Sequence, residues 1–96
     1  MSTLLDFKKI EKISKSLGDP YRLQIIEAIK KHGSKCMQCS DVVGMINLSQ
    51  PAISHHLKLL VEADLIVPEK EGRAVKYTIN KGVFTDYANY LKSFVK

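Results

Sequence analysis

The sequence predicts a small domain that is mainly α with one β-hairpin, in the order α-α-α-α-β-β-α. Two observations carry this prediction: apolar residues recur at helical spacing in successive segments, and two short β-type runs flank a glycine near the C-terminal third. With 96 residues, 45% of them hydrophobic and 26% charged, the composition is ordinary for a globular chain. We therefore expect residues 1–96 to form a single domain with one modest core.

The charge balance favours a polyanionic partner. Fifteen Lys and Arg residues against ten Asp and Glu residues give a formal net charge of +5. No apolar run approaches the roughly 20 residues needed to span a bilayer, and the N-terminus lacks the basic-then-apolar order of a signal peptide. We expect a cytoplasmic protein with no membrane partner.

The first predicted helix covers residues 4–17 and ends near Gly18. Thr3 and Asp6 resemble a capping box at its start. Its two faces differ in chemistry, with an apolar side and a lysine-rich side that is expected to be solvated. The apolar side comprises Phe7, Ile10, Ile13 and Leu17.

The second predicted helix opens with Asp19 as N-cap and Pro20 at the first helical position, and Gly33 stops it. Its apolar arc covers more than half of the circumference, so we expect it to be the buried central helix. This arc comprises Leu23, Ile25, Ile26, Ala28 and Ile29.

A short helix over residues 41–46, a tight turn at 47–48 and a longer helix from Gln50 make a helix-turn-helix. Asn47 suits a left-handed turn conformation. Gly44 lowers the helix propensity of the first of these helices, and close packing against the second would explain why it is tolerated.

The helix beginning at Gln50 has Ser49 as N-cap and Pro51 in its first turn. One side of it is a core face with Ile53, His56, Leu57, Leu60 and Ala63. The other side presents short polar and basic residues, namely Gln50, Pro51, Ser54, His55 and Lys58. Gln, Ser and His side chains can donate to and accept from base edges, and a lysine suits a phosphate, so the pattern indicates a DNA-recognition helix. Taken alone, the stretch also fits an ordinary amphipathic helix with a mild polar face.

Two β-type runs follow at residues 65–69 and 75–79, with Gly72 in the turn between them and Pro68 marking an edge strand. A basic-tipped hairpin directly after a recognition helix is typical of a wing. Lys70, Arg73 and Lys76 could reach a neighbouring groove or the DNA backbone, although charged hairpin tips are usually only solvated.

The last predicted helix, residues 83–95, carries more aromatic surface than a terminal helix needs to cover so small a core. With the apolar stripe of the first helix, it predicts a two-fold homodimer built on the terminal helices. The predicted interface comprises Phe7, Ile10, Phe84, Tyr87, Tyr90, Leu91 and Phe94. The alternative is that this face closes the core of the protomer itself.

The sequence resembles the ArsR/SmtB family of bacterial winged-helix repressors. The resemblance lies in four segments that occur in the family order and with the family spacing, namely residues 17–26, 48–60, 63–66 and 71–77. The resemblance implies a homodimer that occupies a double-stranded operator overlapping its own promoter and leaves when an inducer binds. It implies base-reading roles for Gln50, Ser54 and His55, a wing contact for Arg73, and a structural role for His56.

The family also implies sites for an inducer. Cys36 and Cys39, at C-x₂-C spacing, could place two thiolates on one thiophilic metal or metalloid ion, or oxidise to a disulfide. Two sulfurs do not complete a tetrahedral zinc site, and the pair could equally be two thiols with no task. The family's terminal-helix metal site is not expected, because residues 83–96 contain Asp86 but no histidine or cysteine.

The sequence therefore predicts a sequence-specific DNA-binding transcription regulator that needs no cofactor. Enzyme motifs such as a phosphate loop or a nucleophile elbow are absent, and the Cys-X-X-Cys pair follows a helix rather than the strand that a thiol oxidoreductase would require. Two alternatives stay open: a winged-helix module that binds protein, and a DNA-binding regulator without a ligand.

Overall fold

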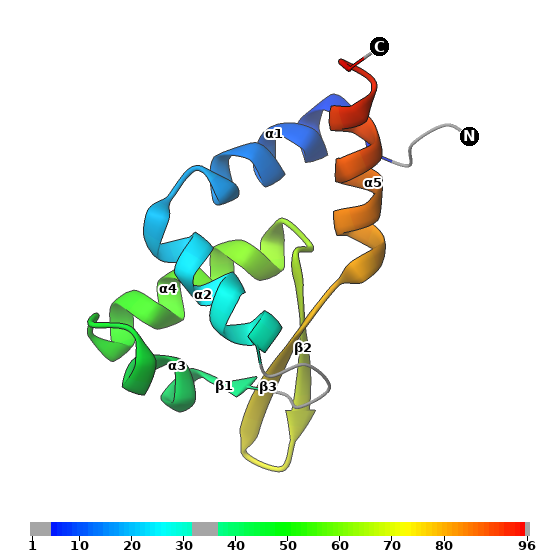
Figure 1. Ribbon diagram of the computed structural model, residues 1–96. Helices are drawn as coiled ribbons and strands as arrows, with labels where there is room; N and C mark the ends of the chain where they lie inside the picture. Colours follow the sequence, from blue (N-terminus) through cyan, green and yellow to red (C-terminus); the bar gives the residue numbers. More distant parts are fainter. Residues whose placement is uncertain (1–4, 32–36, 96) are drawn as a thin grey trace.

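A computed structural model describes residues 5–31 and 37–95, and within this part the predicted order of elements is confirmed with one addition. The addition is the two-residue strand β1. The elements are α1 (Phe7–Leu17), α2 (Pro20–Lys31), β1 (Met37–Gln38), α3 (Cys39–Met45), α4 (Gln50–Glu62), β2 (Ile66–Glu71), β3 (Ala74–Ile79) and α5 (Lys81–Lys92) (Figure 1).

Side-chain caps decide where the helices begin. Ser49 caps α4 by accepting from the Ala52 amide at 3.3 Å, and this confirms the predicted start of the recognition helix. α1 begins later than predicted, because Asp6 is its N-cap, accepting from the Lys9 amide at 2.8 Å.

The start of α5 was also predicted wrongly. Asn80 caps it through a 3.3 Å bond from the Val83 amide, so the helix begins at Lys81, two residues before the first apolar position. A cap residue, and not the apolar pattern, sets the first turn.

The core lies where α1, α2, α3, α4 and the base of the hairpin meet. Its fully buried side chains are Ile13, Ile25, Ile29, Val42, Ile53, Leu57, Leu60, Leu65 and Ile66. Leu23 was expected to belong to this core but is 45% exposed, so the buried arc of α2 is narrower than its apolar arc.

The sheet has three antiparallel strands in the order β1-β3-β2. Pro68 lies on the edge strand β2, as predicted. Glu71 pairs with Ala74, so the hairpin turn is only Gly72 and Arg73, and Gly72 has φ +61°. A positive φ at the first of two turn residues is typical of a type II′ turn, which favours glycine.

Two expectations about local geometry were wrong. The first concerned Asn47, which is not in the left-handed conformation. Instead Asp64, directly after the C-cap of α4, is the one non-glycine residue of the described part with a positive φ, at +60°. A Cβ added at Gly44 would meet nothing within 4 Å, so close packing does not explain this glycine.

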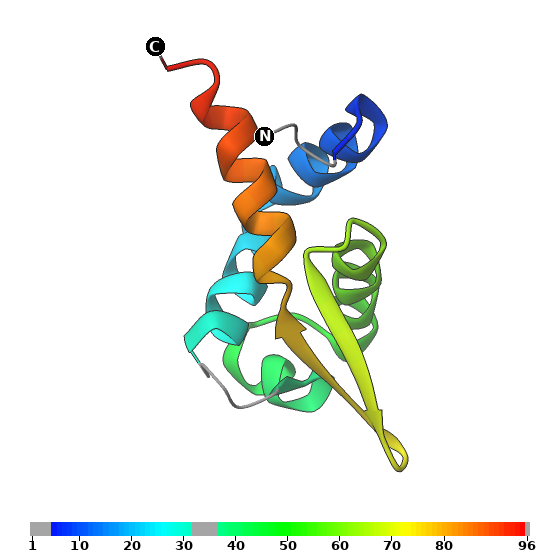
Figure 2. The same cartoon turned by 90° about the vertical axis from the view of Figure 1, so that its right-hand side faces the viewer.

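The molecule is elongated, with extents of 43 × 25 × 22 Å. The wing projects from one end, while α5 rises from β3 to the other end and lies beside α1 (Figures 1 and 2). In the described part of the chain, no helix is both long and apolar enough to cross a membrane.

Candidate nucleic-acid interface

The recognition helix α4 separates its two faces as the sequence predicted. Ile53, Leu57 and Leu60 are buried, with at most 1% exposure, and fix the helix on the core. The opposite face is exposed and comprises Gln50, Pro51, Ser54, His55 and Lys58. With Ser49 also exposed at the start, α4 offers one continuous polar surface that no other described element covers.

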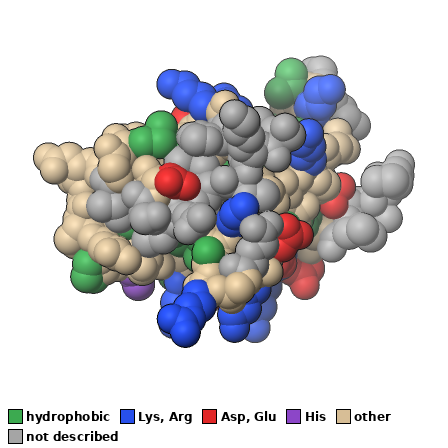
Figure 3. Space-filling view, turned by 90° about the horizontal axis from the view of Figure 1, so that it is seen from below, with side chains coloured by type: hydrophobic (Ala, Val, Ile, Leu, Met, Phe, Trp, Pro, Cys, Tyr) green, Lys and Arg blue, Asp and Glu red, His purple; other side chains and the backbone are tan. Residues whose placement is uncertain are grey.

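The wing places its basic residues unequally. Lys70 and Arg73 are exposed close to or within the turn. Lys76 is half-buried on the central strand, in register with Glu69 on β2 and Gln38 on β1. Figure 3 shows Lys and Arg side chains at several places on the underside with acidic groups between them. Within the wing, the exposed basic side chains are therefore those at the turn, Lys70 and Arg73.

Behind α4, Arg22 ties the recognition helix to the end of α1. Its Nη1 lies 3.2 Å from Nδ1 of His56, and its Nε and Nη2 donate to the carbonyl oxygens of Ser16 and Lys15 at 2.9 and 3.3 Å. Because arginine has only donors, Nδ1 of His56 must accept, which makes the imidazole neutral. The structural role expected for His56 agrees with this position, away from the polar face.

Asp19 completes this cluster. Its carboxylate accepts from the amides of Tyr21 and Arg22 at 2.8 and 3.2 Å, which caps α2, and lies 3.8 Å from the Arg22 guanidinium. Burial raises the pKa of Asp19, but the two amide bonds and the charge of Arg22 outweigh this and hold the pKa below its usual value.

Burial also lowers the pKa of His56, and the positive charges of Arg22 and His55 lower it further, against the opposing charge of Asp19. Arg22 is the residue of this cluster that sequence reasoning missed. It stands within the segment that carries the family resemblance, but no spacing rule assigns its partners, since His56 is 34 positions away.

The cysteine prediction falls mostly outside the described residues. Cys36 lies in the 32–36 segment, and only the backbone of Cys39, the first residue of α3, is described. Within the described part, no group of three or more His, Cys, Asp or Glu side chains could hold a metal ion. The described residues therefore do not complete a site around the pair.

The terminal helices present the apolar surface expected of an interface. Phe7 is 81% exposed and Phe94 71%, and Leu91 is also exposed. The Phe94 ring packs edge-on against Tyr90 with centroids 5.3 Å apart. Ile10, in contrast, is 8% exposed within the protomer, so the structure does not support its predicted place on this face.

Phe84 and Tyr87 of the predicted interface are half-buried and pack against the protomer's core. The Tyr87 hydroxyl lies 2.7 Å from Ser14 Oγ, which joins α5 to α1. The face thus closes part of the protomer's core and leaves its outer aromatic residues uncovered.

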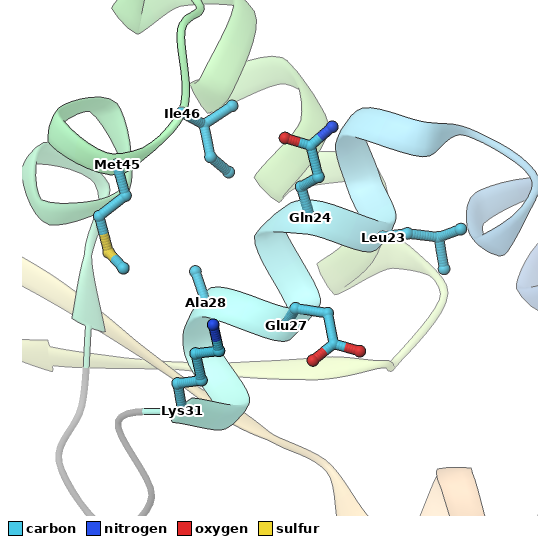
Figure 4. A pocket seen from close by; sticks show the side chains of 7 residues that line it. All are labelled: Leu23, Gln24, Glu27, Ala28, Lys31, Met45 and Ile46. Atoms are coloured by element: carbon cyan, nitrogen blue, oxygen red, sulfur yellow. The ribbon is translucent and has the colours of Figure 1, made fainter.

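A shallow apolar hollow lies between α2 and the end of α3. Its α2 side carries Leu23 and Ala28, and its α3 side Met45 and Ile46, with Gln24, Glu27 and Lys31 around it (Figure 4). Leu23 and Met45 are both exposed here. This is a seam between the supporting helix and the first helix of the helix-turn-helix.

Comparison with known proteins agrees with this geometry. Residues 19–67 match the family described as "Bacterial regulatory protein, arsR family". The chain belongs to the ArsR family. This membership makes it a winged helix-turn-helix transcription regulator that binds DNA, and it excludes the enzyme alternative.

Individual relatives cover most of the chain. The protein is 31% identical over 83 residues to the transcriptional repressor SdpR of Bacillus subtilis (strain 168), covering 86% of this chain and 89% of the relative. It is 35% identical over 85 residues to an arsenical resistance operon repressor of Staphylococcus xylosus, covering 88% and 78%. The fold matches the solved structure of an ArsR-like transcriptional regulator from Rhodococcus sp. RHA1 with a TM-score of 0.80 and 22% identity, over 92% of this chain and 80% of that one.

Proposed function

We propose that this ArsR-family regulator is a homodimeric repressor that reads a two-fold related operator with the exposed face of α4 and grips the backbone with its wing. The observation that carries the proposal is the division of α4 into a fully buried face and an exposed face of Gln, Ser, His and Lys. A dimer would place the two recognition helices in successive major grooves, roughly 34 Å apart.

Each exposed residue has a role set by its chemistry. Gln50, Ser54 and His55 would read base edges, while Ser49 and Pro51 fix the start of the helix against the DNA backbone. The phosphate contacts would come from Lys58, Lys70, Arg73 and Lys76, with Lys76 the least accessible of the four.

Fluorescence anisotropy with DNA from the protein's own upstream region tests the base-reading role. Gln50→Ala should cost about 1–3 kcal/mol on the preferred sequence and little on DNA altered at the base it reads, because a base-edge contact carries sequence information. If Gln50→Ala keeps the full sequence preference, the assignment of the reading face is wrong.

Arg73→Ala distinguishes a contact to the DNA backbone from a contact to base edges. It should weaken all sequences alike and reduce the slope of log affinity against log salt by about one for each phosphate that the side chain neutralises. Lys92→Ala is the matched control, since it removes one exposed positive charge from α5, far along the chain from the wing. Equal slopes for both variants would exclude the wing contact.

For the inducer, we propose a thiophilic metal or metalloid ion, or a thiol oxidant, acting on Cys36 and Cys39. The similarity to a repressor named for arsenical resistance supports this choice. Arsenite, Cd(II), Zn(II) or a persulfide donor should release the reduced protein from DNA, and Cys36→Ser with Cys39→Ser should abolish release. Binding that no addition reverses would mean a regulator without a thiol inducer, and absence of specific binding would favour a protein-binding winged helix.

A further inference from the structure

A cavity of about 270 Å³ lies between α1, α2 and the inner side of α4. We call it the α1–α4 cavity. Lys12, Lys15 and Ser16 of α1, Arg22 of α2, and Leu59 and Glu62 of α4 line it. Figures 1 and 2 both show α1 lying over α4, so a molecule held here would touch both helices.

The lining itself holds three cationic side chains and one carboxylate, and two further carboxylates, Asp19 and Glu11, lie beside Arg22 and Lys15. Lys15 forms an ion pair with Glu11 at 3.6 Å, and both side chains are well exposed. Such a surface pair is weak, so the Lys15 ammonium can turn towards an anion at little cost.

Arg22 gives the cavity a fixed anion-binding group. Its side chain is 14% exposed and is held by Ser16 O, Lys15 O and His56 Nδ1, with the Asp19 carboxylate 3.8 Å from Nη1. These bonds use three of the five N–H donors of the guanidinium. A planar guanidinium held in position suits carboxylate and phosphate oxygens, which it binds with paired hydrogen bonds.

The rest of the lining limits the size and shape of a ligand. Leu59, half-buried on α4, supplies an apolar wall, and the buried Ser16 adds a hydroxyl. The volume is just below the range of about 300–1,000 Å³ that is typical for drug-sized ligands. A molecule with two anionic groups and a short carbon chain fits this combination of charge, volume and apolar wall.

We propose that the α1–α4 cavity binds a small organic dianion, a dicarboxylate or a phosphate monoester, through Arg22, Lys12 and Lys15, with its carbon chain against Leu59. A dianion bound there would contact both α1, which belongs to the proposed dimer interface, and the recognition helix α4. It therefore changes the spacing of the two recognition helices and with it the affinity for the operator, a step that rests on the proposed function.

Titration of the ¹⁵N-labelled full chain with succinate and with glycerol phosphate tests binding without DNA. Amides of residues 12–16 and 59–62 should shift in a saturable way, while succinamide, the neutral analogue of succinate, should leave them unchanged. A dicarboxylate site responds to succinate and a phosphate site to glycerol phosphate. If neither dianion moves these amides, or succinamide moves them equally, the cavity is not an anion site.

Two exposed lining residues give changes of opposite sign. Lys15→Gln should weaken dianion binding by about 2- to 5-fold, and Glu62→Gln should strengthen it by a similar factor, because it removes the carboxylate that belongs to the lining itself. Lys92→Gln, with the same loss of charge on α5, should leave the affinity unchanged. If Lys92→Gln weakens binding as much as Lys15→Gln, the affinity follows the net charge of the protein and the cavity is not the anion site.

The coupling is measured separately, as operator affinity with and without the dianion that binds. Wild type should show an altered affinity, and Lys15→Gln should need a correspondingly higher dianion concentration for the same change. If the dianion binds but operator affinity is constant, the coupling is wrong and the site stands. If the protein does not bind an operator at all, the proposed function has failed while the titration still decides the cavity.

Discussion

His56 belongs to the recognition helix but lies away from its polar face, beside Arg22 and Asp19. Its imidazole accepts the Arg22 hydrogen bond only when neutral, and it lies within ring-contact range of Tyr21 and His55, with centroids 6.2 and 6.1 Å away. Burial first, and then the positive charges around it, lower its pKa in the folded state from the ordinary value of 6.5, while Asp19 opposes them. The cluster is thus matched to a neutral histidine.

This environment predicts a pH dependence of stability. A depressed pKa means that the unfolded chain binds the proton more tightly, so the stability from His56 is complete above 6.5 and is lost as the pH falls through the folded-state pKa. The Tm of wild type should therefore fall more between pH 7.5 and 5.5 than that of His56→Gln, which cannot titrate.

His55→Gln is the matched control, because His55 is the exposed neighbour on the same helix. It should keep most of the wild-type dependence of Tm on pH, because burial, the main cause of the lowered pKa of His56, is unchanged and the contribution of His55 is the smallest. If His56→Gln and wild type lose equal Tm over this range, burial of a neutral imidazole does not contribute to stability.

At the level of elements, two glycines with different geometry make opposite predictions. Gly72 has φ +61° in the two-residue hairpin turn, where alanine costs about 1–2 kcal/mol. Gly44 lies in α3 with open space within 4 Å of the position that a methyl group would take, so alanine there should gain up to about 1 kcal/mol of helix propensity.

Thermal unfolding checks both variants. Gly72→Ala should lower Tm and Gly44→Ala should raise it, by roughly 4–8 °C for each kcal/mol in a domain of this size. A fall in Tm for Gly44→Ala would mean that α3 needs the glycine for a reason that its surroundings do not show.

The same elements show what a sequence can and cannot predict. α2 and α4 begin at the predicted residues, because Asp19-Pro20 and Ser49-Gln50-Pro51 combine a cap with a proline near the first turn. β1 was missed, since two residues carry no alternation and the strand exists only because β3 offers an edge to pair with. Strand pairing of this kind is a tertiary effect and leaves no local pattern.

The candidate site divides in a similar way. Periodicity alone sorted the exposed from the buried residues of α4, because the helix is regular and one of its sides faces the core. The Arg22–His56 contact depends instead on how α2 packs against α4, and the α1–α4 cavity on how α1 crosses α4. Helical periodicity says nothing about how helices cross. The half-burial of Lys76 likewise follows from β1, which makes β3 the central strand.

At the scale of the whole molecule, large apolar side chains of the two terminal helices are exposed, and a monomer gives no reason for this exposure. We call these side chains the aromatic end. Phe94 and Val95 are 71% and 81% exposed at the end of α5, and Phe7 is 81% exposed at the start of α1. The wing and α4 are polar and basic by comparison. A two-fold axis near the terminal helices would bury the aromatic end and leave both recognition helices facing outwards.

Leu91→Ser with Phe94→Ser should therefore convert a dimer to a monomer without unfolding it, since both residues are exposed in the protomer. Light scattering after gel filtration measures the mass, and circular dichroism reports the fold. Operator affinity should drop by about 10²-fold or more, because the second half-site is no longer tethered. Val67→Ser removes a comparably exposed apolar side chain from the edge strand β2, and it should leave the mass unchanged. A folded double variant that is still dimeric would place the two-fold axis on another face and would change the predicted spacing of the recognition helices.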